Sequence, residues 1–122
     1  MMHVSTSNDF KHKFPNYPKA DKEKILAFIN HVKQHCLDGL QGRNKASDNV
    51  PFDHPNWSER VAFAQKYHLW HYHIGIPNYT TASNGEQVSQ YILHYMRLEN
   101  EIRIIALSDH PPFALPTEKE LV

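Results

Sequence analysis

Apolar residues recur at two different periods along the chain, and the two periods predict different elements. From Asp21 to Leu40 apolar side chains return every three or four residues, which predicts one long helix with Asp21 as its N-cap. Cys36 lies on the apolar stripe of this helix, so we expect its thiol to be packed and unreactive. A shorter helix is expected over residues 59–66, after a Gly-, Asn- and Pro-rich loop at residues 41–55.

The other periodic segments alternate with period two, as strands do. Residues 66–76 form the most distinctive of them, because three histidines and three aromatic residues fall within residues 67–73. We expect one face of this strand to carry Leu69, His71 and His73, and the other to pack on a core through His68, Trp70, Tyr72 and Ile74. Further strands are expected over residues 88–97 and 102–108, joined by a hairpin turn at residues 98–101.

The two ends of the chain have weaker patterns. Residues 9–14 alternate between apolar and polar, which predicts a short edge strand, and residues 1–8 and 114–122 are expected to be flexible. The predicted order is a short N-terminal strand, one or two helices and a three-stranded antiparallel meander, in a single domain of residues 1–122. This order is typical of a two-layer α+β fold.

Composition restricts the classes of function. Thirteen basic and thirteen acidic residues cancel, so any contact with RNA must depend on a local patch. No apolar run approaches the roughly 20 residues that span a bilayer, and the N-terminus does not resemble a signal peptide, so we expect a cytoplasmic protein with no membrane partner. The single cysteine excludes an internal disulfide and a zinc site built on thiolates.

Histidine is the unusual component, with ten residues in 122. Imidazole donates or accepts a proton near neutral pH, and two imidazoles at alternate positions of a strand lie about 6.5 to 7 Å apart. His71 and His73 are therefore candidates for acid–base chemistry, together with His94 on the next strand and His110 at the end of the last one. The scattered histidines are interpreted as polar surface residues: His3, His12, His31, His35 and His54.

Several short motifs accompany the predicted meander. Asp38-Gly39 follows the long helix, Gly42-Arg43 and Glu59-Arg60-Val61-Ala62 come next, and the last strand runs into His110-Pro111-Pro112. On these motifs and on the strands at 66–75, 91–95 and 102–107, the chain resembles the RelE/ParE superfamily of toxins. Within that superfamily, residues 36–116 are most similar to YafO-type toxins.

The resemblance implies a RelE-like fold and the toxin of a type II toxin–antitoxin system. Such a toxin is a metal-independent, ribosome-dependent endoribonuclease without a cofactor, and its partners are a cognate antitoxin, the ribosome and mRNA. In the reaction a base removes the proton of the RNA 2′-hydroxyl, the oxygen attacks the phosphate, and an acid protonates the leaving 5′-oxygen. The positions that match the acid–base groups are His71, His73, His94 and His110, and those that match substrate-binding groups are Arg43, Tyr95, Arg97 and Arg103.

Two features depart from this resemblance. Typical members are strongly basic, whereas this chain is neutral and has histidines where relatives often have Lys or Arg. ParE-type relatives act on gyrase instead of RNA, so a non-nuclease ParE-like toxin or binding module is an alternative. Another alternative is a metal site in which His71, His73 and a third histidine on a neighbouring strand are ligands.

Overall fold

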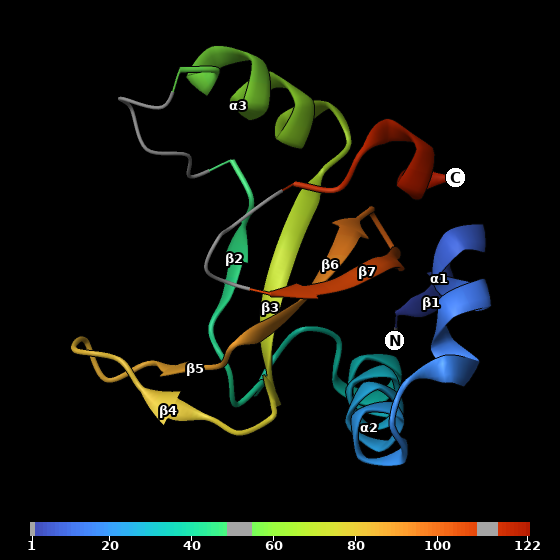
Figure 1. The fold of residues 1–122 in the computed structure, drawn as a ribbon, viewed down its shortest axis with the longest axis vertical. Helices are drawn as coiled ribbons and strands as arrows, with labels where there is room; N and C mark the ends of the chain where they lie inside the picture. The colour runs from blue at the N-terminus through green and yellow to red at the C-terminus, as the bar shows by residue number, and fades with distance from the viewer. Residues whose placement is uncertain (1, 49–54, 110–114) are drawn as a thin grey trace.

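A mixed five-stranded sheet forms the centre of the protein, whose computed structural model describes residues 2–48, 55–109 and 115–122 (Figure 1). The strands lie in the order β1-β7-β6-β3-β2, in which β1 is parallel to β7 and the other neighbours are antiparallel. Their bounds are β1 His3–Thr6, β2 Asn44–Ala46, β3 Leu69–Ile76, β6 Tyr91–Arg97 and β7 Glu101–Asp109. The predicted α+β class and the antiparallel meander of β3, β6 and β7 are therefore confirmed.

Helices pack around this sheet, and a small hairpin extends from it. The helical segments are α1 Asn8–Lys13, η1 Phe14–Asn16, α2 Lys19–His35, α3 Trp57–Lys66 and η2 Glu118–Leu121. Strands β4 Thr80–Thr81 and β5 Gln87–Val88 form the hairpin, which lies to one side of the main sheet in Figure 1. Its turn includes Asn84-Gly85, and Gly85 has a φ of +88°, a backbone conformation that glycine adopts readily.

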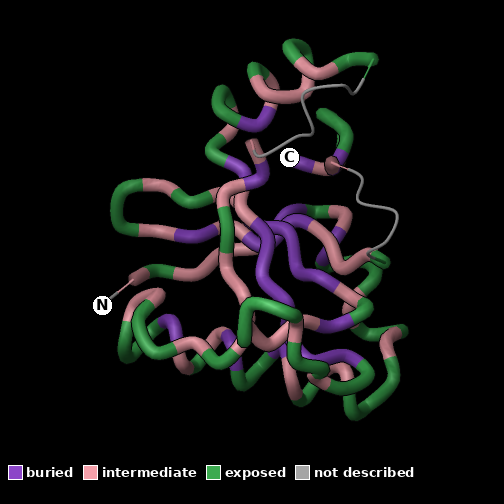
Figure 2. The backbone as a smooth tube through the Cα atoms, turned by 90° about the vertical axis from the view of Figure 1, so that its left-hand side faces the viewer, coloured by how far each residue is buried: buried purple, intermediate pink, exposed green. Residues whose placement is uncertain are grey.

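The main core lies between α2 and one face of the sheet. Ile25, Phe28 and Val32 of α2 are buried against Tyr72 of β3, whose ring stacks on that of Phe28 with centroids 4.9 Å apart. The members of this core recur at three- and four-residue steps in α2 and at alternate positions in β3, so both predicted periods are confirmed. In Figure 2 the buried residues gather in the central strands, and most exposed residues lie in the helices and loops.

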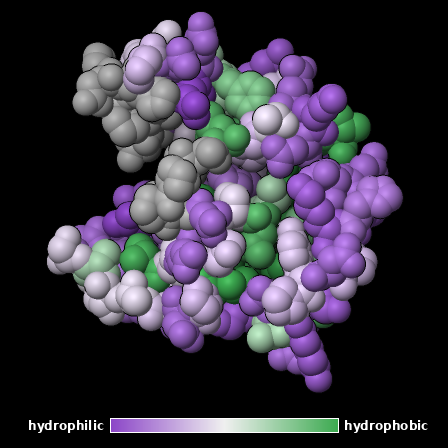
Figure 3. All heavy atoms as spheres, in the orientation of Figure 1, coloured by the Kyte–Doolittle hydropathy of each residue, from purple (hydrophilic) through white to green (hydrophobic). Residues whose placement is uncertain are grey.

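A second, smaller apolar cluster lies on the other face of the sheet. It joins Ala64 of α3, Leu69 of β3, Ile105 of β7 and Leu121 of η2. Hydrophilic residues cover most of the surface shown in Figure 3, and hydrophobic ones are visible mainly in recesses. The sheet is thus covered on both faces, but the two clusters differ in size and position.

The predicted edge strand at residues 9–14 is wrong, because Asn8–Lys13 forms helix α1. Ser7 is the N-cap, and its hydroxyl accepts a hydrogen bond from the amide of Phe10 at 3.2 Å. The short strand of the fold is instead β1, within the segment that we expected to be flexible. At the other end, η2 has a capping box between Thr117 and Glu120 and a buried Leu121.

The long helix is shorter than predicted and is shifted toward the N-terminus. It starts after Pro18 instead of at Asp21, and it ends at the C-cap Cys36, which has a φ of +57°. The shorter helix extends over Trp57–Lys66, so its predicted C-terminal end is confirmed. No helix in the described part of the chain is long and apolar enough to span a membrane.

Candidate functional site

Three neighbouring strands bring a cation and two imidazoles into one row. In the sheet register Lys45 of β2 is opposite His71 of β3, and His71 is opposite His94 of β6. Residues directly opposite in an antiparallel pair point to the same face, with Cβ atoms about 4.5 to 5.5 Å apart. The row Lys45–His71–His94 therefore crosses the face of the sheet that is opposite α2.

His73 lies beside this row, two residues further along β3. Its ring centroid is 6.1 Å from that of His71, close to the separation predicted from strand geometry. The predicted division of β3 into a histidine face and a core face is confirmed for residues 69–74, since Tyr72 and Ile74 are in the α2 core. A one-residue slip in register would move His71 and His73 into that core, so the packing of Tyr72 against α2 fixes their orientation.

A serine lies within hydrogen-bond distance of each of the three imidazoles. Nδ1 of His71 is 2.9 Å from the Ser47 hydroxyl, and Nε2 of His94 is 2.8 Å from the Ser108 hydroxyl. Nδ1 of His73 lies 3.0 Å from both the backbone amide and the carbonyl of Ser89. Because a hydroxyl both donates and accepts, Ser47 and Ser108 can hold their histidines in either tautomer.

The three histidines and Lys45 differ in how far each side chain is exposed. His94 and His73 are 1 % and 4 % exposed, His71 is 9 % exposed, and the side chain of Lys45 at the sheet edge is 44 % exposed. Accessibility thus increases from β6 toward the edge strand β2, and a ligand of this row would approach from the β2 side. The low exposure also fixes the imidazole orientations, because buried polar groups keep their hydrogen bonds.

Two of the predicted substrate-binding residues lie on the other face of the sheet. Tyr95 is fully buried in the α2 core, where its hydroxyl donates to Oδ1 of Asn44 at 2.6 Å. Burial is the main reason that the pKa of this phenol is raised above its ordinary value. Arg97 stacks on the ring of Trp70, with Cζ 4.6 Å from the ring centroid. Neither Tyr95 nor Arg97 therefore joins the histidine row.

The two other predicted arginines are near the histidine face but have different environments. Arg43 donates from Nε and Nη2 to Glu86 of the β4–β5 connection, both at 3.0 Å, and this hydrogen bond is the main reason that the pKa of Glu86 is lowered. Arg103 is opposite Met96 in the register, two positions along β6 from His94. Its Nε is buried without an acceptor in the described part of the chain. His110 and His54 lie outside the described residues.

Sequence analysis missed the partners of the histidines. It named Ser47, Ser89 and Ser108 in no role, and it assigned residues 41–55 to a loop although Asn44–Ala46 forms β2. The alternation of the charged residues Arg43 and Lys45 with the uncharged Asn44 and Ala46 is a signal that could have indicated this edge strand.

The described residues of the histidine face do not form a ready set of metal ligands. Among residues 2–48, 55–109 and 115–122, no three His, Cys, Asp or Glu side chains converge so as to hold an ion. The arrangement of Lys45, His71 and His94 instead places a positively charged side chain beside two imidazoles, a type of side chain that can donate or accept a proton.

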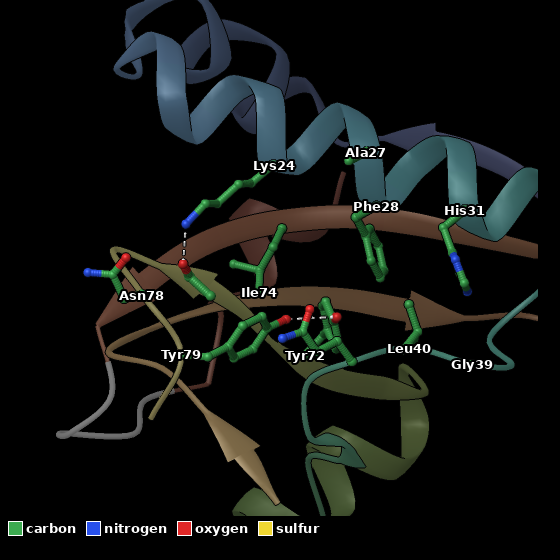
Figure 4. Close-up of a pocket in the computed structure, with 12 residues that line it drawn as sticks. Lys24, Ala27, Phe28, His31, Gly39, Leu40, Tyr72, Ile74, Asn78 and Tyr79 are labelled. Carbon is green, nitrogen blue, oxygen red and sulfur yellow. Dashed lines mark hydrogen bonds between the residues drawn. The ribbon is translucent and has the colours of Figure 1, made fainter. Parts of the chain in front are cut away.

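A separate cleft of about 560 Å³ lies on the other side of β3, between α2 and the end of that strand (Figure 4). Lys24 reaches across it to donate to the carbonyls of Gly75 and Pro77, and the hydroxyls of Tyr72 and Tyr79 are 2.9 Å apart. Burial raises the pKa of Tyr79, and the hydrogen bond with Tyr72 raises it further. This phenol therefore stays protonated at neutral pH. His31 of α2 also lines the cleft, as Figure 4 shows.

Comparisons with known proteins give no match: no family model, no curated protein and no solved structure is similar to this chain.

Proposed function

We propose that the protein is the toxin of a type II toxin–antitoxin pair, a ribosome-dependent endoribonuclease that cleaves translated mRNA in the cytoplasm. The observation that carries the proposal is the row Lys45–His71–His94 across three strands, with His73 beside it. In this proposal the partners are a cognate antitoxin, the ribosome and mRNA, and the reaction uses no metal ion.

The row suits the chemistry of RNA cleavage through the 2′-hydroxyl. One imidazole accepts the 2′-hydroxyl proton as the oxygen attacks the adjacent phosphorus, and a second imidazole donates a proton to the leaving 5′-oxygen. The ammonium of Lys45, opposite His71, lies 3.9 Å from Oε1 of Glu86, and in this proposal it leaves that carboxylate to stabilise the negative charge of the phosphorane. His71 is the most exposed histidine of the row, so it is the imidazole that we assign closest to the substrate.

Element order supports the same proposal. The chain runs from β1 through α1, α2, the edge strand β2 and α3 to the meander β3–β6–β7, and a strand, then helices, then a meander is the order that the resemblance to RelE-like toxins implies. In this proposal the fold is RelE-like. The neutral net charge means that binding to the ribosome depends on local groups, of which Lys45 is one at the edge of the sheet.

Expression of the gene from a controlled promoter in bacterial cells tests the proposal. We expect growth to stop and translated transcripts to be cut, with the ends mapped by primer extension. His71→Gln and Lys45→Met are each expected to restore growth, since acid–base catalysis contributes about 10²–10⁴-fold and a charge-stabilising donor about 10²–10³-fold.

Matched controls separate the site from the rest of the surface. His12→Gln and Lys11→Met change exposed residues of α1 and are expected to leave the arrest unchanged. Growth arrest with intact transcripts and a DNA-damage response would contradict cleavage and favour the gyrase-directed alternative. If folded His71→Gln and Lys45→Met proteins stay fully toxic, the site assignment is wrong.

A further inference from the structure

The C-terminal end of α2 carries a pair of histidines with the spacing of a metal chelate. His31 and His35 are four residues apart on one face of the helix, and their ring centroids are 5.2 Å apart. Two imidazoles bound to one tetrahedral zinc ion, through nitrogens about 2.1 Å away, have ring centroids about 5 Å apart. The centroid separation of the two rings is therefore that of two imidazoles bound to one ion.

The tautomer of His31 is fixed by a backbone contact. Nε2 of His31 is 2.5 Å from the carbonyl oxygen of Asp38, and because a carbonyl only accepts, Nε2 must carry the proton. In the neutral ring Nδ1 then has the lone pair that a metal ion requires. A histidine ligand that donates its other N–H to a backbone carbonyl is the usual arrangement around bound metal ions.

The local charge and exposure also favour a cation. His35 is in the last turn of α2, next to the C-cap Cys36 and in the same turn as Lys33, and His31 lies one turn before it; the helix dipole is negative at this end. His35 is exposed and His31 is half-buried, and both line a surface depression of about 570 Å³ together with Cys36 and Asp38. The depression leaves space for water molecules to complete the coordination of an ion.

We propose that His31 and His35 form a zinc-binding site at the C-terminal end of α2, with water in the remaining coordination positions. No three potential ligand side chains converge within the described parts of the chain, so the site has two protein ligands and is open. It lies on the helix that covers the core face of the sheet, and the inference does not depend on the proposed nuclease activity.

Titration of the purified protein with zinc chloride in a calorimeter tests this site. We expect one equivalent to bind, and His35→Ala to weaken binding by at least about tenfold, because ligand and outer-sphere changes typically cost 10–100-fold. His35 is exposed, so its replacement is expected to leave the fold intact. His12→Ala is the matched control on α1 and should bind zinc like the wild type. Magnesium chloride should give no heat, because Mg²⁺ prefers oxygen ligands.

Nuclear magnetic resonance of the protein labelled with ¹⁵N histidine provides a second readout. The ring nitrogens of His31 and His35 are expected to shift on addition of zinc, and those of the other described histidines to stay in place. Absence of zinc binding by the wild type would overturn the proposal. Unchanged affinity of His35→Ala, or shifts confined to His71, His73 and His94, would overturn it as well, because the ion would then be bound elsewhere.

Discussion

Replacement of Tyr95 is expected to change the stability of the protein without changing its function. Its hydroxyl donates to Oδ1 of Asn44 inside the α2 core, on the face away from the histidines. Tyr95→Phe keeps the ring and leaves that oxygen without its donor, so we expect a loss of about 0.5–1.5 kcal/mol in the free energy of unfolding, measured by urea denaturation. RNA cleavage should be unchanged. Loss of cleavage by a folded Tyr95→Phe protein would contradict the separation of the two faces.

The same phenol makes stability depend on alkaline pH. Burial raises the pKa of Tyr95 above 10.0, the ordinary value at which a tyrosine ionises in the unfolded chain. The stability that the neutral phenol contributes is therefore complete below pH 10 and is lost as pH rises above it, because only the unfolded chain releases the proton. We expect the urea midpoint of the wild type to fall above pH 10 more steeply than that of Tyr95→Phe. Parallel curves would show that this phenol is not buried.

Gly42 allows β2 to approach β3 closely. A Cβ atom at this position would lie 1.9 Å from the carbonyl oxygen of His73, a backbone atom that cannot move without disturbing the strand. Gly42→Ala is expected to cost about 3 kcal/mol of stability, at the upper end for overpacking. Gly85→Ala is the control, since no atom lies within 4 Å of its Cβ and only its φ of +88° is unfavourable, at about 1 kcal/mol. Equal costs measured by urea denaturation would contradict the close approach.

For single residues, the sequence predicts which face of a strand a side chain occupies, but not which residue lies opposite it on the next strand. Alternation alone assigns His71 and His73 to one side of β3. The same alternation in β6 places His94 and Tyr95 on opposite faces, although both were predicted to belong to the site. The pairing of His71 with His94 depends on the register of two strands that are more than twenty residues apart. Register is a non-local property, so the partners of each imidazole could not be predicted.

At the scale of elements, Ser7 determines the start of α1. Its hydroxyl accepts from the amide of Phe10 and is 3.2 Å from the carbonyl of Ile105, to which it donates. Ser7→Ala removes both bonds at a site that is 1 % exposed, and we expect a loss of about 1–2 kcal/mol. Thermal unfolding followed by circular dichroism measures the change. Ser58→Ala, at an exposed position of α3, is the control, and a similar loss there would contradict the capping role of Ser7.

Helix α1 also shows why a short segment can be assigned wrongly. Six residues are too few to distinguish a period of 3.6 from a period of two, and Phe10 and Phe14 fit both. The deciding interactions are the Ser7 cap and the burial of Phe10 against α2. Longer segments were predicted better, because α2 and β3 present several periods of their pattern to one core. Their bounds still shifted, since caps such as Pro18 and Cys36 are local details of the backbone.

At the scale of the whole molecule, β1 closes the fold. It pairs in parallel with β7 through residues 3–6 and 101–104, and the amide of Asn8 donates to the carbonyl of Val122 at 2.8 Å. Removal of residues 2–6 exposes the edge of β7, so we expect a lower unfolding temperature and self-association. Size-exclusion chromatography and thermal unfolding measure both. A truncated protein that is monomeric and as stable as the full chain would contradict the role of β1.

The central claim is that the row Lys45–His71–His94 cleaves RNA on the ribosome, and one measurement tests it most directly. Purified protein is added to ribosomes translating a defined mRNA, and the rate of cleavage is followed by primer extension for the wild type, His71→Gln and His12→Gln. The account predicts cleavage only when ribosomes are present, a rate for His71→Gln lower by about 10²-fold or more, and an unchanged rate for His12→Gln. An uncut mRNA with the folded wild type, or equal rates for all three proteins, would contradict the account.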